Sequence, residues 1–166
     1  MCDDIETTRY TLKKGTILYS GNSGKRNIQT LSDIFKYIGQ RGEVSIKGEF
    51  VLYASSDYDT SKGYAFSCLN QTGFIHKFRV TRNIILWEQS VFEDADEVAK
   101  CVCSALIKGI VVRYSKHHDE YALCSPEDYL EYISTQKCIG NGKTSEEYNI
   151  LDKVTAHDLV MDTMPY

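Results

Sequence analysis

The chain has 166 residues, of which 42% are hydrophobic and 25% charged, a balance typical of a globular protein and not of a disordered one. One domain is expected at this length, since such a chain buries about 70% of its unfolded surface when it folds. Nineteen Lys and Arg against 23 Asp and Glu give a net charge of −4, which disfavours a general nucleic-acid binder.

The apolar segments and the N-terminus bear on where the protein resides. The longest apolar stretches, residues 84–87 and 105–112, are far shorter than the roughly 20 residues of a membrane span. The acidic start, Met1 to Asp4, fits neither a secretory signal nor a transit peptide. We therefore expect an intracellular, cytoplasmic protein without membrane contact, a nuclear location remaining open, and six cysteines present as thiols.

Apolar runs and turn residues predict an alternation of short strands and helices. The expected strands cover residues 16–20, 50–54, 74–80, 84–87, 109–114 and 120–124. A turn is expected at 21–24, and helices at 27–38, around 64–68 after a polar capping segment, at 98–106 and at 126–132. A hairpin connection is expected at 115–119.

Short strands and helices without regular βαβ alternation predict an α+β fold. We expect one domain over residues 1–133 and a C-terminal extension, residues 134–166, packed on the same domain. The extension is separated because the chain becomes polar and glycine-containing from Ser134 to Gly142.

Two patterns that resemble known binding motifs are rejected. Gly142-Lys143-Thr144 ends like a phosphate-binding loop, but Lys137 stands where that motif needs a glycine. The cysteines form no C-x-x-C pair, and Cys101 and Cys103 would point apart on a helix. No metal site is therefore expected.

Three segments carry residue types suited to a pocket: a tight backbone turn, aromatic faces and one carboxylate. They are Leu18-Tyr19-Ser20-Gly21, then Tyr53-Ala54 with Tyr64, and Asp119-Glu120-Tyr121-Ala122-Leu123. Each segment alone is a weak signal, because aromatic pairs more often belong to a core and a single Glu at a strand start is usually solvated.

Taken in order, these segments resemble the ADP-ribosyltransferase superfamily, in its His-Tyr-Glu branch related to the poly(ADP-ribose) polymerase catalytic domain. Residues 18–21 match the first motif, except that Ser20 replaces the histidine. Residues 48–64 match the second, in which two tyrosines lie eleven positions apart, as Tyr53 and Tyr64 do. Residues 120–132 match the third most closely, and the resemblance covers residues 15–133.

The resemblance implies two small antiparallel-rich sheets that form a cleft flanked by helices, with NAD bound as substrate and no metal. Glu120 is implied as the catalytic residue, because a carboxylate stabilises the oxocarbenium character of the ribose as nicotinamide leaves. The implied NAD-binding residues are Ser20 at the adenosine ribose, Gly21 and Ser61 at the carboxamide, and Tyr53 and Tyr64 on the nicotinamide ring. An alternative register aligned on Ala54 puts Leu52 in the first stacking position.

The function that the resemblance implies is transfer of ADP-ribose from NAD to a macromolecular acceptor, as mono-ADP-ribosylation, with release of nicotinamide. A protein acceptor is favoured over a nucleic acid. Ser20 motivates a first alternative, an inactive ADP-ribosyltransferase-like binding or scaffold module. A second, an RNA 2'-phosphotransferase, shares the fold, but it needs basic residues for phosphate, and the first motif here has neither Arg nor His.

Overall fold

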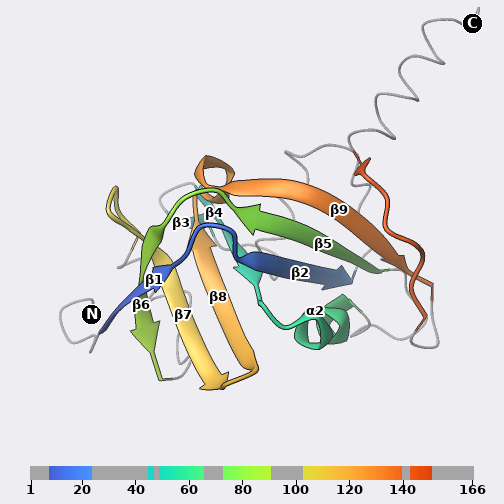
Figure 1. Ribbon diagram of the computed structural model, residues 1–166, viewed down its shortest axis with the longest axis horizontal. Helices are drawn as coiled ribbons and strands as arrows, with labels where there is room; N and C mark the ends of the chain where they lie inside the picture. The colour runs from blue at the N-terminus through green and yellow to red at the C-terminus, as the bar shows by residue number, and fades with distance from the viewer. Residues whose placement is uncertain are drawn as a thin grey trace, which may run out of the picture.

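The computed structural model describes residues 8–23, 45–46, 49–65, 73–90, 103–139 and 143–150, which are mostly β-sheet (Figure 1). The strands are β1 (Thr8–Leu12), β2 (Ile17–Ser23), β3 (Ser45–Ile46), β4 (Glu49–Ala54), β5 (Gly73–Val80), β6 (Ile84–Gln89), β7 (Ile107–Ser115), β8 (His118–Cys124) and β9 (Leu130–Cys138). The helices in this part of the chain are α2 (Tyr58–Ala65) and the 3-10 helix η2 (Pro126–Asp128).

The strands form two sheets. One has six strands in the order β1-β6-β7-β8-β4-β3, and the other has three in the order β2-β5-β9. Within the described strands every pairing is antiparallel except that of β6 with β7. Two sheets with few helices are compatible with a small α+β domain.

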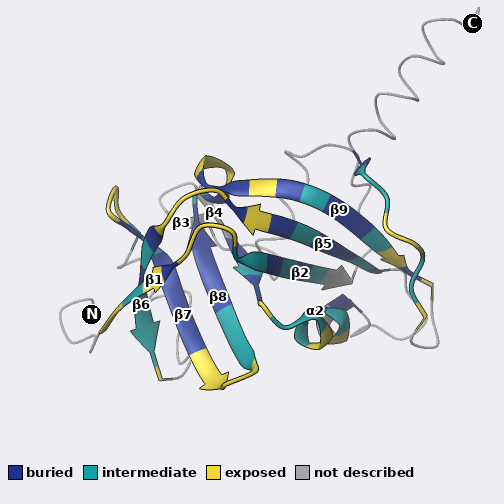
Figure 2. Cartoon of the chain, in the orientation of Figure 1, coloured by how far each residue is buried: buried dark blue, intermediate teal, exposed yellow. Residues whose placement is uncertain are grey.

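The two sheets share one hydrophobic core. The three-stranded sheet contributes Leu18 and Phe78, and the six-stranded sheet contributes Leu52, Val111 and Leu123, all fully buried. Burying a side chain of this size stabilises the fold by about 1.5 to 3 kcal/mol. The expected cleft between the sheets is therefore filled by apolar side chains over the described residues. Figure 2 shows long buried stretches in β7 and β8.

Among the described residues, the backbone pairing of Tyr19 with Ser55 joins the sheets edge to edge. The Tyr19 amide donates to the Ser55 carbonyl at 2.7 Å, and the Ser55 amide donates to the Tyr19 carbonyl at 2.8 Å. Directly opposed residues of an antiparallel pair place their side chains on the same face. The face of β2 that carries Tyr19 therefore continues into the face of β4 that carries Tyr53.

Helix α2 packs on this outer face of the three-stranded sheet. The rings of Tyr19 and Tyr58 meet edge to face with centroids 5.4 Å apart, and Ala65 packs with buried groups of β5 and β9. Asp57 caps the helix, because its Oδ2 accepts from the Thr60 amide at 3.1 Å and from the Thr60 hydroxyl at 2.6 Å. The hydrogen bond from the Thr60 side chain is the main reason that the pKa of Asp57 is lowered.

The predicted strands all occur in the structure, with shifted ends. The turn expected at residues 21–24 is wrong for Gly21 to Ser23, because these residues continue β2 and pair with β5. The hairpin connection is shorter than expected, since β7 ends at Ser115 and β8 begins at His118.

The helix expected at 126–132 is wrong. Only Pro126–Asp128 form a 3-10 turn, and β9 begins at Leu130. Leu130 and Tyr132 are buried while Glu131 between them is exposed, which is strand alternation. Strand β9 runs through the predicted boundary at residues 133 and 134, so the start of the predicted extension belongs to the three-stranded sheet.

Two further expectations concern residues near Cys103. The helix expected at 98–106 does not include residues 104–106, which form bends before β7; residues 98–102, like the helix expected at 27–38 and Cys68, lie outside the described residues. The expectation of thiols is wrong for Cys103 and Cys124, which form a disulfide with Cα atoms 6.1 Å apart. Cys138 is a buried free thiol, as expected. No helix among the described residues is long and apolar enough to cross a membrane.

Candidate functional site

Gly21 lies on the outer face of β2, directly against helix α2. A Cβ at this position would overlap the Ser61 carbonyl and lie 3.2 Å from the Ala65 amide nitrogen. Alternate residues of an antiparallel strand direct their N–H and C=O to the same side. Tyr19 pairs toward Ser55, so Gly21, two residues on, also directs its backbone groups to the edge where β4 and α2 lie.

Ser20 lies on the opposite face of β2, in the shared core. Its side chain has no exposed surface, and its hydroxyl donates to the Tyr53 carbonyl at 2.6 Å. Ser20 therefore links β2 to β4. The structure does not bring the Ser20 side chain to the face that holds Gly21.

Ser61 is close to Gly21 but is also committed to the backbone. It is buried in α2, and its hydroxyl donates to the Tyr19 carbonyl at 2.8 Å. The same carbonyl accepts the Ser55 amide. Helix α2 is thus anchored at the point where the two sheets join.

Tyr53 and Leu52 lie on opposite faces of β4. Leu52 is fully buried in the core between the sheets. Tyr53 is half-buried on the other face, opposite Ala122 of β8, and packs beside a second apolar cluster that includes Ile107 and Ile110. Of these two side chains, Tyr53 and not Leu52 therefore has exposed surface on which a ligand ring could stack. Tyr64 lies in α2, and its side chain is outside the described residues.

Glu120 lies near the start of β8 and shares a face with Tyr53. Residues two apart on a strand face the same way, so Glu120 and Ala122 lie together, and Ala122 is opposite Tyr53. The Glu120 side chain is 17% exposed. Figure 2 shows that β8 changes from buried to intermediate toward its start, which places Glu120 where the core ends.

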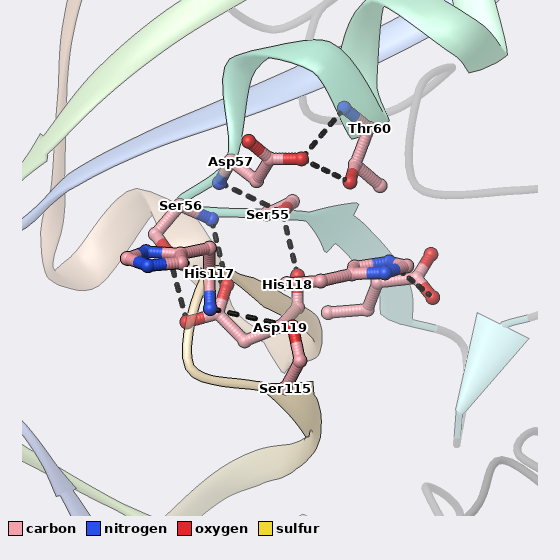
Figure 3. A network of polar contacts seen from close by, with 9 residues as sticks. Ser55, Ser56, Asp57, Thr60, Ser115, His117, His118 and Asp119 are labelled. Atoms are coloured by element: carbon pink, nitrogen blue, oxygen red, sulfur yellow. Dashed lines mark hydrogen bonds and ion pairs between the residues drawn. The ribbon is translucent and has the colours of Figure 1, made fainter.

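A polar network beside Glu120 ties the hairpin to the loop before α2 (Figure 3). The Asp119 carboxylate accepts from the Ser56 amide at 2.9 Å, from the Ser56 hydroxyl at 2.7 and 2.8 Å, and from the Tyr121 hydroxyl at 3.0 Å. The Ser55 hydroxyl donates to the Asp119 carbonyl at 2.5 Å and accepts from the Asp57 amide at 2.9 Å. These bonds fix the backbone on both sides of the junction.

Sequence reasoning missed Asp119, Ser55 and Ser56 as positioning residues. A polar run after a strand signals only a loop, and the partner of that loop lies more than 60 positions away along the chain. Asp119 and Glu120 are adjacent in the sequence, but the sequence does not tell which carboxylate is bound by the loop before α2 and which lies on the face of the candidate site.

The structure therefore brings together Gly21, Tyr53 and Glu120 on one continuous face, with Ser61 of α2 at its border. Ser20 faces the core instead. Among the described residues, no group of three or more His, Cys, Asp or Glu side chains is arranged to hold a metal ion.

Comparison with known proteins gives no match: no family model fits the chain, and neither a curated protein nor a solved structure is significantly similar to it.

Proposed function

We propose that this protein is an ADP-ribosyltransferase that moves ADP-ribose from NAD to a protein acceptor as a single unit, with the two sheets forming an ADP-ribosyltransferase-like fold. One observation carries the proposal. The pairing of Tyr19 with Ser55 puts a glycine backbone, an aromatic ring and a carboxylate, from three strands distant in sequence, on one face.

Each group on this face has a task in that reaction. The Gly21 amide and carbonyl hold the nicotinamide carboxamide, since both point to the edge shared with β4. The Tyr53 ring packs against the nicotinamide ring, a contact typical of aromatic side chains. Gly21 is also needed for the fold, because a Cβ at this position would collide with α2.

Glu120 stabilises the reacting sugar. The bond between ribose C1 and the nicotinamide nitrogen breaks, and its electron pair leaves with neutral nicotinamide. Positive charge then develops on the ribose, and a carboxylate beside it lowers the free energy of that transition state. Because Glu120 keeps only 17% of its side-chain exposure, this interaction is less screened than one in bulk water.

The proposal places no ligand contact on Ser20, because its hydroxyl is buried and bound to Tyr53. The same observation, with the Ser61 hydroxyl bound to Tyr19, favours a second candidate. In that candidate the domain binds NAD or a partner through this face without transferring ADP-ribose.

The test is nicotinamide release and label transfer from labelled NAD. Glu120→Gln keeps the shape of the side chain and removes its charge, so we expect a loss of about 10²-fold or more. Glu131→Gln is the matched control, because Glu131 is an exposed carboxylate of β9 that pairs with Arg79. This variant should keep the parental rate.

The possible results separate the candidates. NAD binding without nicotinamide release supports the inactive module. Equal rates for the parent and Glu120→Gln would show that Glu120 is structural. A folded protein that neither binds nor cleaves millimolar NAD contradicts the transferase and leaves only a module that binds a partner through this face.

A further inference from the structure

A histidine faces the proposed catalytic carboxylate. His118 Nε2 lies 3.6 Å from Glu120 Oε2. This nitrogen is shielded from solvent and has no hydrogen-bond partner among the described residues. The imidazole as a whole nevertheless keeps 43% of its side-chain exposure. Nε2 therefore lies toward the carboxylate, and the exposed surface of the side chain is elsewhere than at this nitrogen.

Three titratable groups of the described residues lie around this imidazole. Glu120 faces it from the same strand, and the Tyr114 ring of β7 lies against it with centroids 4.9 Å apart and a 39° tilt. Asp57, ahead of α2, is close enough for the charge of His118 to contribute to the lowered pKa of that carboxyl. Burial, followed by the charge of Glu120, raises the pKa of Tyr114, so its phenol stays neutral.

We propose that His118 is the general base of the transfer and that the acceptor is a hydroxyl group. This inference rests on the proposed function. A carboxylate that faces one ring nitrogen orients the imidazole and stabilises its protonated form, which is the logic of an acid–His pair in nucleophilic catalysis.

The acceptor oxygen forms a bond to ribose C1 while the bond from C1 to the nicotinamide nitrogen breaks. Nicotinamide leaves neutral with that electron pair. The acceptor O–H proton moves to His118 Nδ1, and the resulting imidazolium is held by Glu120 Oε2 across Nε2–H until Nδ1 returns the proton to solvent.

The presence of a base indicates the class of acceptor. A carboxylate acceptor is already ionised at neutral pH and has no proton to lose. A serine or tyrosine side chain, a sugar hydroxyl, and water each must lose one. A general base at this point therefore accelerates attack by a hydroxyl and leaves attack by a carboxylate unchanged.

The experiment measures NAD cleavage between pH 5 and 8 with water as the acceptor that is always present. His118→Gln should lower the rate about 10²-fold and remove the fall in rate at the acid end of this range. His117→Gln is the matched control, because Figure 3 shows His117 and His118 directed to opposite sides of the turn. Free imidazole should restore activity to His118→Ala but not change His117→Ala.

Two peptides that differ only by Ser or Glu at one position extend the test to the acceptor. We expect transfer to the Ser peptide, lost in His118→Gln. Equal rates and pH profiles for His118→Gln and the parent, no rescue by imidazole, or transfer confined to the Glu peptide would overturn the inference while leaving the role of Glu120 intact. Absence of nicotinamide release by the parent would instead contradict the proposed function itself.

Discussion

Two histidines in this molecule occupy opposite environments. His76 of β5 is fully buried, with Nδ1 2.8 Å from the Thr135 hydroxyl and with Nε2 lacking a partner among the described residues. His118 is half-exposed beside a carboxylate. Burial lowers the pKa of His76 to about 3, so His76 stays neutral and cannot exchange protons near neutral pH. Of the two histidines, only His118 has the solvent access that the proposed general base needs.

The surroundings of His76 serve the fold. The Thr135 hydroxyl that contacts His76 also lies 2.6 Å from the Tyr132 hydroxyl, and the Tyr132 hydroxyl accepts the Ile150 amide at 2.9 Å. Thr135 and Tyr148 exchange backbone hydrogen bonds at 2.7 and 2.9 Å. These contacts attach residues 143–150 to β9, so this network stabilises the interior while that of Asp119 positions the candidate site.

The largest expected effect is a loss of stability at low pH that depends on His76 and not on His118. The pKa of His76 in the folded protein, about 3, lies below its ordinary value of 6.5, so the unfolded chain binds the proton first. The contribution of neutral His76 to the free energy of unfolding is complete above about pH 6.5. It falls by about 1.4 kcal/mol per pH unit as the pH drops toward about 3. Urea unfolding at pH 7 and pH 4.5 should show this loss in the parent and in His118→Gln, and a smaller loss in His76→Gln. Parallel losses in all three proteins would contradict the comparison.

A smaller effect tests the packing of α2 on the site face. Gly21→Ala places a Cβ into the Ser61 carbonyl and should lower the free energy of unfolding by about 1 to 3 kcal/mol. Gly63→Ala in the same helix is the control, because a Cβ there meets no described atom within 4 Å. It should stabilise the helix by about 0.5 to 1 kcal/mol. Thermal unfolding of both variants decides, and equal shifts would be evidence against the close approach.

Asp119→Asn tests the polar network with a cost of about 1 kcal/mol. The Asn side chain has one acceptor oxygen, so it cannot accept both from the Ser56 amide, now at Oδ1, and from the Tyr121 hydroxyl, now at Oδ2, and one of these donors loses its acceptor. Removing that hydroxyl by Tyr121→Phe should reduce the cost of Asp119→Asn in a double-mutant cycle. Additive losses would mean that Asp119 does not hold Tyr121.

The smallest effect is expected at an exposed ion pair on the far side of the hairpin from Glu120. Arg113 donates to Glu88 through Nε at 3.1 Å and Nη2 at 2.9 Å. With both side chains partly exposed, the pair should contribute about 0.2 to 1 kcal/mol. A double-mutant cycle in low and high salt should give a coupling that decreases with salt. A larger, salt-independent coupling would show a stronger role for this surface.

Much of the fold was predictable because strands carry a local signal. Residues 74–80 and 109–114 are apolar runs bounded by polar segments, and both are strands in the structure. The segment after Pro126 was misassigned, since a proline favours a helix start while the alternation at Leu130 to Tyr132 was too short to outweigh it. The disulfide of Cys103 with Cys124 depends on the approach of two distant segments, which spacing does not reveal.

The residue types of the candidate site were predictable from the sequence, but the strand face on which each side chain lies was not. Glu120 and Tyr53 could be named from their motifs, and the strand register then puts them on one side. Ser20 and Gly21 are neighbours in sequence, yet they lie on opposite faces of β2: the Ser20 hydroxyl bonds to β4, and α2 packs against Gly21. His118 and Glu120 are two residues apart on β8 and therefore share a face, but the approach of the imidazole to the carboxylate depends on side-chain conformations that the sequence does not specify.

The most direct test of the central claim is an NMR titration of the parent protein with NAD, following backbone amide shifts. If NAD binds the face formed where the two sheets join, the largest shifts occur at Gly21, Tyr53 and Glu120, while the amides of β1 and β9 stay unchanged. No shifts at millimolar NAD, or shifts confined to β1 or β9, would contradict the account.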